Sequence, residues 1–557
     1  MKKKVLLIVA LALAACMLSG CSLPMLMTLF TTREVTQNKA VEYPMEVTET
    51  EEGVWEGMAY EDAAYDSLMM TAMPGGGAYY DPYEEFNTEE YAAIEENGFR
   101  KVATDPLSTF SADVDTASYC NLRRMLNDDW YAGQIPSGAV RVEEMLNYFR
   151  YDYPAPQGGD KFGVTAQIAP CPWNPANMLL MLGVRAADAP EVADDGSNLV
   201  FLVDVSGSMA YENKLELVKK ALTMLVDELT DKDTVSIVTY ASGERVLIEG
   251  ASPVKDKAKL LSAIDSLYAE GSTNGQRGLA QAYEVAQKNL RPKGNNRVIM
   301  CSDGDLNVGM TSESDLHDYV SKQKETGIYL SVLGFGEGNY KDTKMETLAD
   351  DGNGNYYYID SILEARKVLC EELTQTLYSV ADDVKFQIEF NPAKVSAWRQ
   401  IGYENRALQN QDFEDDKKDA GEVGAGATVT VLYELVPAGE GDGEGGLKYQ
   451  DSTLTEAGQS GEWATLSTRY KEPGASESKL ETTAVGEDAF TDAPSGDILF
   501  AAAVAEFGMI LNESEHKGDA SYETVLELLK QAPLSDEYRE EFFSLVKIAQ
   551  RAQALSE

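Results

Sequence analysis

The sequence predicts an α/β fold built on a doubly wound, mostly parallel sheet, with an N-terminal module before it and a C-terminal β-rich and helical region after it. Two apolar runs, Asn198–Val203 and Val298–Ser302, have the composition of buried strands, and each is followed directly by an aspartate. Around them, further apolar strands alternate with stretches of helical periodicity. This alternation is typical of parallel strands joined by crossover helices.

The central domain is predicted over residues 196–376. From Lys214 to Leu229 the apolar residues recur at helical spacing, which indicates an amphipathic helix. Further strands are expected over 234–239, 245–248, 328–333 and 356–359, and further helices around 255–268 and 277–290.

Two more folded segments are predicted on either side of this domain. Residues 96–190 contain enough apolar and helix-capping residues to form an N-terminal module. Residues 377–557 are expected to form a layer of strands followed by helices. The strands are predicted over 383–390, 428–435, 447–449 and 463–470, and the helices over 498–511, 522–531 and 537–555.

Short polar side chains gather where the predicted strands of the central domain end. Asp204, Ser206 and Ser208 follow the first strand, Asp303 follows the second, and Thr273 opens a helical stretch between them. Because loops at the carboxyl ends of parallel strands meet at one edge of a doubly wound sheet, we expect these side chains to form one site. Carboxylate and hydroxyl oxygens are ligands for hard divalent cations.

In these residues the chain resembles the von Willebrand factor type A (VWA) domain and its metal-ion-dependent adhesion site (MIDAS). The resemblance implies a Mg²⁺ or Mn²⁺ ion held directly by Ser206, Ser208 and Thr273. It implies that Asp204 and Asp303 bond to the ion partly through water. It also implies that a carboxylate from a partner protein completes the coordination.

The resemblance extends beyond the metal motifs. The segments Gly336–Tyr340, Leu348–Tyr356, Asp419–Gly426 and Phe500–Met509 are similar to a family of bacterial VWA-domain lipoproteins. That family has a characteristic N-terminal module and a C-terminal domain of unknown function. The similarity runs from about residue 96 to the end of the chain, so it implies the domain order more firmly than an activity.

Residues 1–21 predict a lipoprotein signal peptide. A lysine-rich start precedes the apolar run Val5–Met17, which is too short for a typical membrane span. The order Leu-Ser-Gly before Cys21 resembles a bacterial lipobox, in which the cysteine becomes the lipidated N-terminus. Cys16 follows Leu-Ala-Ala and is the alternative, as is an uncleaved anchor helix. We therefore expect an extracytoplasmic protein anchored by lipid to the cell membrane or outer membrane.

Residues 22–95 are acidic, contain glycine clusters and show no sustained period. Such a segment cannot bury enough apolar surface to offset the entropy of ordering, so we predict a disordered tether. A docking peptide built on its aromatic residues is the alternative. The whole chain has 93 acidic and 47 basic residues, a net charge of -46. This charge argues against nucleic acid and against electrostatic docking on anionic lipids, because both require basic patches.

Four cysteines lie beyond the signal region. Cys301 and Cys370 are expected as buried free thiols, whereas a Cys120–Cys171 bridge remains open. The chain has only 2 histidines, which removes most routes to a zinc site or a Ser-His-Asp triad.

These observations favour a binding protein that is not an enzyme and that captures a carboxylate of a protein partner through its metal. One alternative is an envelope assembly or accessory factor whose metal face docks on the chain's own flanking modules. Another is a metal-assisted hydrolase, which requires a general base. Asp305 is the candidate for that role, although a loop carboxylate of this kind is usually only solvated.

Overall fold

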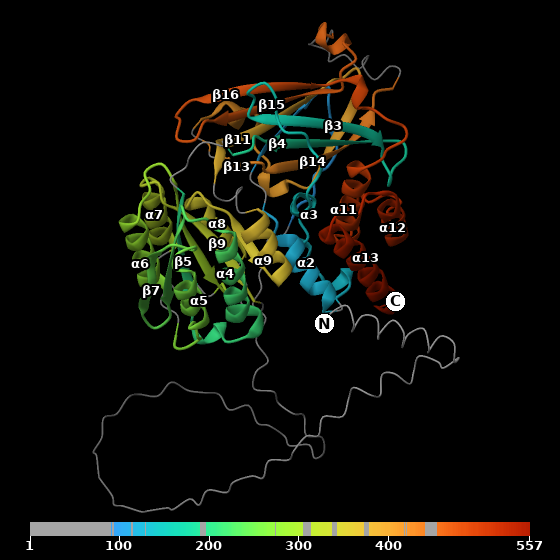
Figure 1. The fold of residues 1–557 in the computed structure, drawn as a ribbon. Helices are drawn as coiled ribbons and strands as arrows, with labels where there is room; N and C mark the ends of the chain where they lie inside the picture. Colours follow the sequence, from blue (N-terminus) through green and yellow to red (C-terminus); the bar gives the residue numbers. More distant parts are fainter. Residues whose placement is uncertain are drawn as a thin grey trace, which may run out of the picture. The chain divides into compact units, whose positions relative to one another are not determined.

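The computed structural model describes residues 91, 94–112, 115–128, 130–189, 196–272, 275–304, 313–336, 342–372, 378–416, 418, 420–439 and 454–556. The chain divides into two units, Met1–Tyr80 and Asp81–Glu557. All described residues belong to the second unit (Figure 1). The predicted signal peptide, both candidate lipidation cysteines and most of the predicted tether lie outside the described residues.

The central domain is a six-stranded sheet with the order β10-β9-β8-β5-β6-β7. Its strands are β5 (Ser197–Asp204), β6 (Thr234–Tyr240), β7 (Glu244–Ala251), β8 (Asn295–Ser302), β9 (Tyr329–Phe335) and β10 (Tyr356–Ile359). All neighbours pair in parallel except β6 and β7, which form an antiparallel edge. The predicted doubly wound, mostly parallel sheet is therefore confirmed.

Helices cover both faces of this sheet (Figure 1). They are α4 (Leu217–Glu228), α5 (Lys257–Asp265), α6 (Gly275–Lys288), α7 (Glu313–Lys324), α8 (Asp342–Asp351) and α9 (Ile362–Arg366), with π-helical turns η6 (Glu212–Glu216) and η7 (Lys367–Glu371). One core contains side chains of α4, α5 and α9, and the other contains side chains of α6, α7 and α8. The predicted helix from Lys214 to Leu229 begins as the π-helical turn and continues as α4, with its apolar stripe buried.

Two antiparallel sheets combine strands from both ends of the chain. One has the order β1-β12-β14-β4-β3 and the other β13-β11-β15-β16, with β2 paired to β11. The strands are β1 (Arg100–Lys101), β2 (Leu107–Ser111), β3 (Phe162–Pro170), β4 (Met178–Ala186), β11 (Ser379–Phe390), β12 (Val395–Ile401), β13 (Val423–Gly424), β14 (Thr428–Pro437), β15 (Ala464–Lys471) and β16 (Ser478–Val485). Their facing side chains form one core, so the segments predicted as two separate modules fold together.

A layer of helices packs on the opposite face of the first of these sheets. It consists of α2 (Ala117–Asn127), α3 (Val142–Tyr148), α11 (Asp497–Leu511), α12 (Tyr522–Gln531) and α13 (Glu537–Ser556). Short helical turns are η3 (Ala132–Gln134), η4 (Ser137–Ala139), η5 (Gly207–Met209), η8 (Glu404–Arg406), η9 (Asn410–Glu414), η10 (Ala457–Gln459) and η11 (Glu487–Ala489). Within the described part of the chain, no helix is long and apolar enough to cross a membrane.

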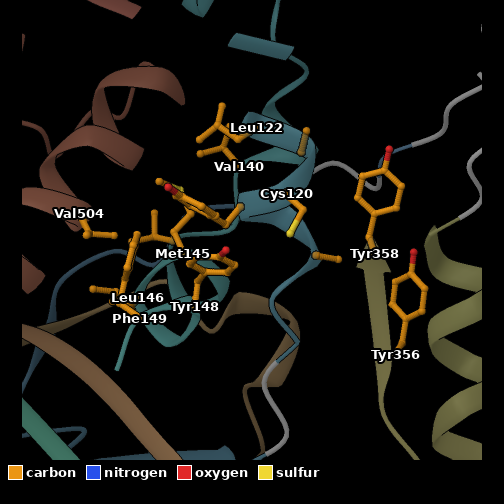
Figure 2. Close-up of a cluster of buried hydrophobic side chains, with 14 of the residues drawn as sticks. Cys120, Leu122, Val140, Met145, Leu146, Tyr148, Phe149, Tyr356, Tyr358 and Val504 are labelled. Carbon is orange, nitrogen blue, oxygen red and sulfur yellow. The ribbon is translucent and has the colours of Figure 1, made fainter. Parts of the chain in front are cut away.

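The helical layer and the central domain share one apolar core. Figure 2 shows Cys120 and Tyr148 of the helical layer on one side and Tyr356 and Tyr358 of β10 on the other. Cys120, Tyr148, Tyr356 and Tyr358 are each at most 2% exposed. The edge strand β10 is thus one place where the central domain packs on the rest of the unit, and Glu346 of α8 forms another contact through its ion pair with Arg406.

The predicted elements of the C-terminal region lie close to the observed ones, and α12 has the predicted bounds. The strand predicted over 447–449 falls outside the described residues. Strands β3, β4, β12 and β16 were not predicted. All four described cysteines are free, so the bridge left open between Cys120 and Cys171 does not form. Cys301 is buried as expected, whereas Cys370 is only half-buried.

Candidate metal site

The two predicted aspartates lie at the same edge of the central sheet. Asp204 ends β5, and Asp303 directly follows β8, which is the parallel neighbour of β5 with Val203 opposite Cys301. Asp204 is 0% exposed and Asp303 is 3% exposed. The parallel register therefore brings together two carboxylates that are about a hundred residues apart in the sequence, as the strand-end argument predicts.

The first motif forms a compact turn over Asp204. The backbone N–H of Ser206 donates to Asp204 Oδ1 at 2.8 Å, which fixes the orientation of that carboxylate. The hydroxyl oxygens of Ser206 and Ser208 are 3.0 Å apart. Ser206 is buried and Ser208 is half-buried, so the pair lies between the core and the surface. Three of the five predicted ligands are thus brought together by one turn.

The loop that carries the fourth predicted ligand is tied to this turn. Gly207 N donates to Gly271 O at 3.0 Å, and Glu270 N donates to Val205 O at 2.7 Å. Thr273 follows two residues later and lies outside the described residues. The hydrogen bond between Gly207 and Gly271 nevertheless shows that the second motif begins next to the first.

Ser242 is a further support for this loop. Its hydroxyl oxygen accepts a hydrogen bond from Ser272 N at 3.0 Å. Gly271 has φ +78, and a Cβ added there would lie 2.5 Å from Ser242 Oγ. Glycine is therefore required at position 271 both for its backbone conformation and for space. Sequence reasoning missed Ser242, although its place just after strand β6 was a usable signal.

The two carboxylates of the site have different surroundings, because Asp303 pairs with a lysine and Asp204 pairs with none in the described part of the chain. Lys214 Nζ lies 3.2 Å from Asp303 Oδ2, and both side chains are at most 3% exposed. The lysine side chain packs on Gly336, where a Cβ would approach Lys214 Cε to 2.3 Å. The buried Tyr240 hydroxyl lies next to the Asp204 carboxylate, whose buried Oδ2 makes no well-formed hydrogen bond among the described residues. Burial raises the pKa of Asp204 to about 6, against the lowering effect of its hydrogen bonds to Ser206.

This donor set fits a hard divalent cation. It offers hydroxyl and carboxylate oxygens, and one buried carboxylate oxygen makes no well-formed hydrogen bond among the described residues. Ser206 and Ser208 would hold Mg²⁺ or Mn²⁺ directly, and Asp204 and Asp303 would support it through water. Lys214 lies at this site through its pair with Asp303, and the sequence pattern did not identify it, because a lysine inside an amphipathic helix carries no signal of metal chemistry.

A second group of potential metal ligands, Cys120, Asp360 and Glu364, lies where β10 meets the helical layer. A guanidinium already neutralises it, since Arg123 Nη2 is 3.0 Å from Glu364 Oε2 and also pairs with Asp360. Burial raises the pKa of both the Cys120 thiol and the Glu364 carboxyl. We therefore assign this group to the structure of the domain junction and not to metal binding.

Three segments of the chain match known families. Residues 198–369 match the von Willebrand factor type A domain, and residues 85–181 match a family described as von Willebrand factor. Residues 375–552 match the family "Uncharacterized protein YfbK, C-terminal". The "Uncharacterized protein YfbK" of Escherichia coli (strain K12) is 41% identical over 485 residues, which cover 84% of this chain and 82% of that protein. The chain belongs to the YfbK family.

The YfbK order of N-terminal module, VWA domain and C-terminal domain is the order that the sequence resemblance predicted. VWA domains that contain a MIDAS bind divalent metals, and VWA domains typically mediate protein–protein binding. Outside the YfbK family, the inter-alpha-trypsin inhibitor heavy chain H3 of Mesocricetus auratus is 26% identical over 174 residues. That match covers 29% of this chain and 19% of the heavy chain.

Solved structures are also similar to parts of the chain. The von Willebrand factor type A protein from Catenulispora acidiphila is 16% identical with a TM-score of 0.37, and the match covers 72% of this chain and 91% of that one. Proximal thread matrix protein 1 from the mussel byssus, solved with a zinc-occupied MIDAS motif, is 22% identical with a TM-score of 0.26. That match covers 32% of this chain and 46% of the mussel protein.

Proposed function

We propose that this protein is a lipid-anchored component of the cell envelope that binds a protein partner through a divalent metal. The observation that carries the proposal is the pair of hydroxyl oxygens of Ser206 and Ser208, 3.0 Å apart, above the oriented carboxylate of Asp204. Asp303 follows the neighbouring strand β8 at the same edge of the sheet. Neutral hydroxyl ligands leave a bound Mg²⁺ or Mn²⁺ electrophilic toward an acidic side chain.

The rim of the site is accessible to a partner. Gly207, Gly271 and Ser272 are exposed, and Ser208 is half-buried. A carboxylate arriving from outside can therefore reach the hydroxyl pair, while Asp204 and Ser206 stay in the core. This exposure favours an external protein ligand over docking of the metal loops on the chain's own modules.

One group of ion pairs between the central domain and the helical layer supports the accessory-factor alternative. Arg123 of the helical layer pairs with Asp360 and Glu364, which follow β10 at the same carboxyl edge of the sheet as the metal site. The central domain thus docks internally through β10 and leaves the loops of β5 exposed. We propose internal docking as the way in which the domain is held and external binding as its function.

We propose binding and not catalysis as the role of the metal. Neither described carboxylate of the site is free to act as a general base. Asp204 accepts a hydrogen bond from the backbone of Ser206, and Asp303 pairs with Lys214. Asp305, the base considered for a hydrolase, lies outside the described residues. Measuring hydrolysis of generic ester and phosphodiester substrates in Mn²⁺ tests this point, and turnover abolished by Asp305→Asn would contradict it.

The lipid anchor is tested by metabolic labelling with palmitate. We expect label in the wild-type chain and in Cys16→Ala but not in Cys21→Ala. Label lost only in Cys16→Ala would move the lipidation site to Cys16. No label in any of the three chains would overturn the anchor.

The metal site is tested by titration calorimetry of Mg²⁺ and Mn²⁺ into the full chain in mild detergent. We expect binding by the wild type and by Ser266→Ala, a control at an exposed serine, and loss of binding in Asp204→Ala and Ser206→Ala. Partner capture from envelope extracts should then require metal and be reversed by EDTA. Equal metal binding by all four chains would rule out this site.

A further inference from the structure

A polar cavity of about 400 Å³ lies at the edge of the central sheet opposite to the metal site. Its walls are the first residues of β8 and β9, the turn before β10 and loops of the antiparallel sheets. Strand β8 links the two ends, because Arg297 near its start lines the cavity and Asp303 follows its last residue. At a rise of about 3.3 Å per residue, the two lie ~20 Å apart.

Arg297 is buried at this cavity and forms no ion pair with a described residue. It is 5% exposed, and Nη1 donates to Ser331 Oγ at 2.6 Å. The guanidinium also lies over the Tyr329 ring, 5.7 Å from its centre. Its Nε is buried with no hydrogen-bond partner among the described residues. Glu422, on the wall of the same cavity, acts on the guanidinium through its charge without pairing with it directly.

Other buried arginines in the described part of the chain are paired. Arg399 lies 2.9 Å from Glu434, and Arg539 lies 2.9 Å from Asp497. Arg123 has three acidic partners. Arg297 therefore departs from the rule by which this molecule stabilises buried guanidinium groups, and burying a charge without a counter-ion is costly.

The charge on Arg297 persists at neutral pH. Burial lowers the pKa of its guanidinium to about 10, which still leaves it protonated at pH 7. An oxyanion in the cavity would supply a directly paired counter-ion, because a guanidinium presents a planar fork of donors that matches carboxylate and phosphate groups. The volume lies within the range of small-molecule sites.

We propose that this cavity binds a small ligand through a single oxyanion group anchored on Arg297. Asn353, Asn355 and Ser379 line the same cavity and can hydrogen-bond the rest of the ligand. Asp350 and Glu422 also lie on its wall, as do Arg406 and Lys418, so with Arg297 the lining has three basic and two acidic side chains. A monocarboxylate matches this small excess of positive charge better than the doubly charged inorganic phosphate does.

The test is thermal denaturation of the full chain in detergent with acetate, inorganic phosphate or chloride at equal ionic strength. We expect acetate to raise Tm by about 2–4 °C relative to chloride, and phosphate to raise it less. Acetate and phosphate are also excluded from protein surfaces and stabilise folded proteins without a site, so only the part of the rise that depends on Arg297 reports the cavity. No Arg297-dependent rise with either anion would overturn the proposal, and a larger Arg297-dependent rise with phosphate would assign the site to phosphate groups.

Variants connect the response to the cavity. Arg297→Met should abolish the rise, whereas Arg551→Met, which removes an exposed arginine, should leave it unchanged. If Arg297→Met fails to fold, Asn355→Asp is the second variant, because it puts a negative charge on the cavity wall. Asn355→Asp should abolish the rise, whereas Arg551→Met should retain it. A full response in Arg297→Met or in Asn355→Asp would overturn the proposal.

Discussion

Lys214 is the side chain whose charge bears most directly on the metal site. Its ammonium lies 3.2 Å from Asp303 Oδ2 in a buried pair, so it partly neutralises one of the two carboxylates that would support the ion. A fixed positive charge a few ångströms away also repels a divalent cation. The residue thus stabilises the metal-free state and opposes loading.

Replacing this lysine should therefore tighten metal binding. We expect Lys214→Met to lower the Kd for Mn²⁺ by about tenfold, because it removes the repulsion and keeps a side chain of similar length. Lys219→Met, in α4 beside exposed Glu216, is the matched control and should not change the Kd. Titration calorimetry at constant ionic strength measures both, and unchanged or weaker binding by Lys214→Met would show that the lysine only holds Asp303 in place.

Glu143 should make stability depend on pH. Burial, then repulsion from Glu404 and Glu144, raises its pKa to about 7 from an ordinary value near 4.5. Between these values the folded state holds a proton that the unfolded state has released, so the free energy of unfolding falls as pH rises toward 7. The expected loss over this range is about 3 kcal/mol.

Glu143→Gln should remove this loss, because the amide does not titrate. Urea unfolding at pH 5 and pH 8 measures the difference, and Glu540→Gln at an exposed site should keep the wild-type dependence. The same pH dependence in Glu143→Gln and wild type would mean that other groups cause it.

At the scale of elements, the loop before α6 determines whether the separate motifs form one site. Gly271→Ala would place a methyl group 2.5 Å from Ser242 Oγ at φ +78, so the loop must shift away from Gly207. We expect metal affinity to fall by about tenfold or more while the fold is retained. Calorimetry and thermal denaturation on the same sample separate the two effects.

Gly327→Ala is the control for backbone strain alone. Gly327 has φ +79 with nothing within 4 Å of an added Cβ, and it precedes β9 at the opposite edge of the sheet. Gly327→Ala should lose about as much stability as Gly271→Ala does, and it should keep the metal affinity of the wild type. A similar loss of affinity in both variants would mean that strain, and not the position of the loop, sets the affinity.

The elements with strong local patterns could be predicted from the sequence. Strand β10 and helix α12 have the predicted bounds, since apolar periodicity and a serine cap mark them locally. Asp204 and Asp303 were placed together because parallel neighbours share an edge. Ser242 and Lys214 were missed, because a lone hydroxyl or amine gains its meaning only from the carboxylate or loop beside it in space.

At the scale of the whole molecule, the pairing of distant segments could not be predicted. Strand β14 pairs with β4, and β11 pairs with β2, across the entire central domain. Such registers depend on contacts between segments more than two hundred residues apart, and no local pattern specifies the partner. The central domain is consequently an insertion into a shared scaffold, packed on it at β10 and also joined to it by the ion pair between Glu346 of α8 and Arg406.

Arg123 is the side chain that ties the central domain to this scaffold. It lies on α2 and pairs with Asp360 after β10, with Glu364 on α9 and with Glu541 on α13, while 2% exposed. Removing one member of a buried ionic network leaves its partners uncompensated and costs about 3–5 kcal/mol. Because the network spans the junction, we expect this cost to uncouple the domains.

The sequence supplies a readout for this uncoupling, since none of the 5 tryptophans lies in residues 196–376. Tryptophan fluorescence therefore follows the scaffold, and far-UV circular dichroism follows both parts. We expect coincident urea transitions in the wild type and in Arg551→Met, but an earlier dichroism transition in Arg123→Met. Arg123→Met/Glu364→Gln should restore part of the coincidence, because the amide can still accept from the Tyr148 hydroxyl, which lies 2.7 Å from Glu364. Coincident transitions in Arg123→Met would show that the apolar core at β10 couples the domains without the ionic network.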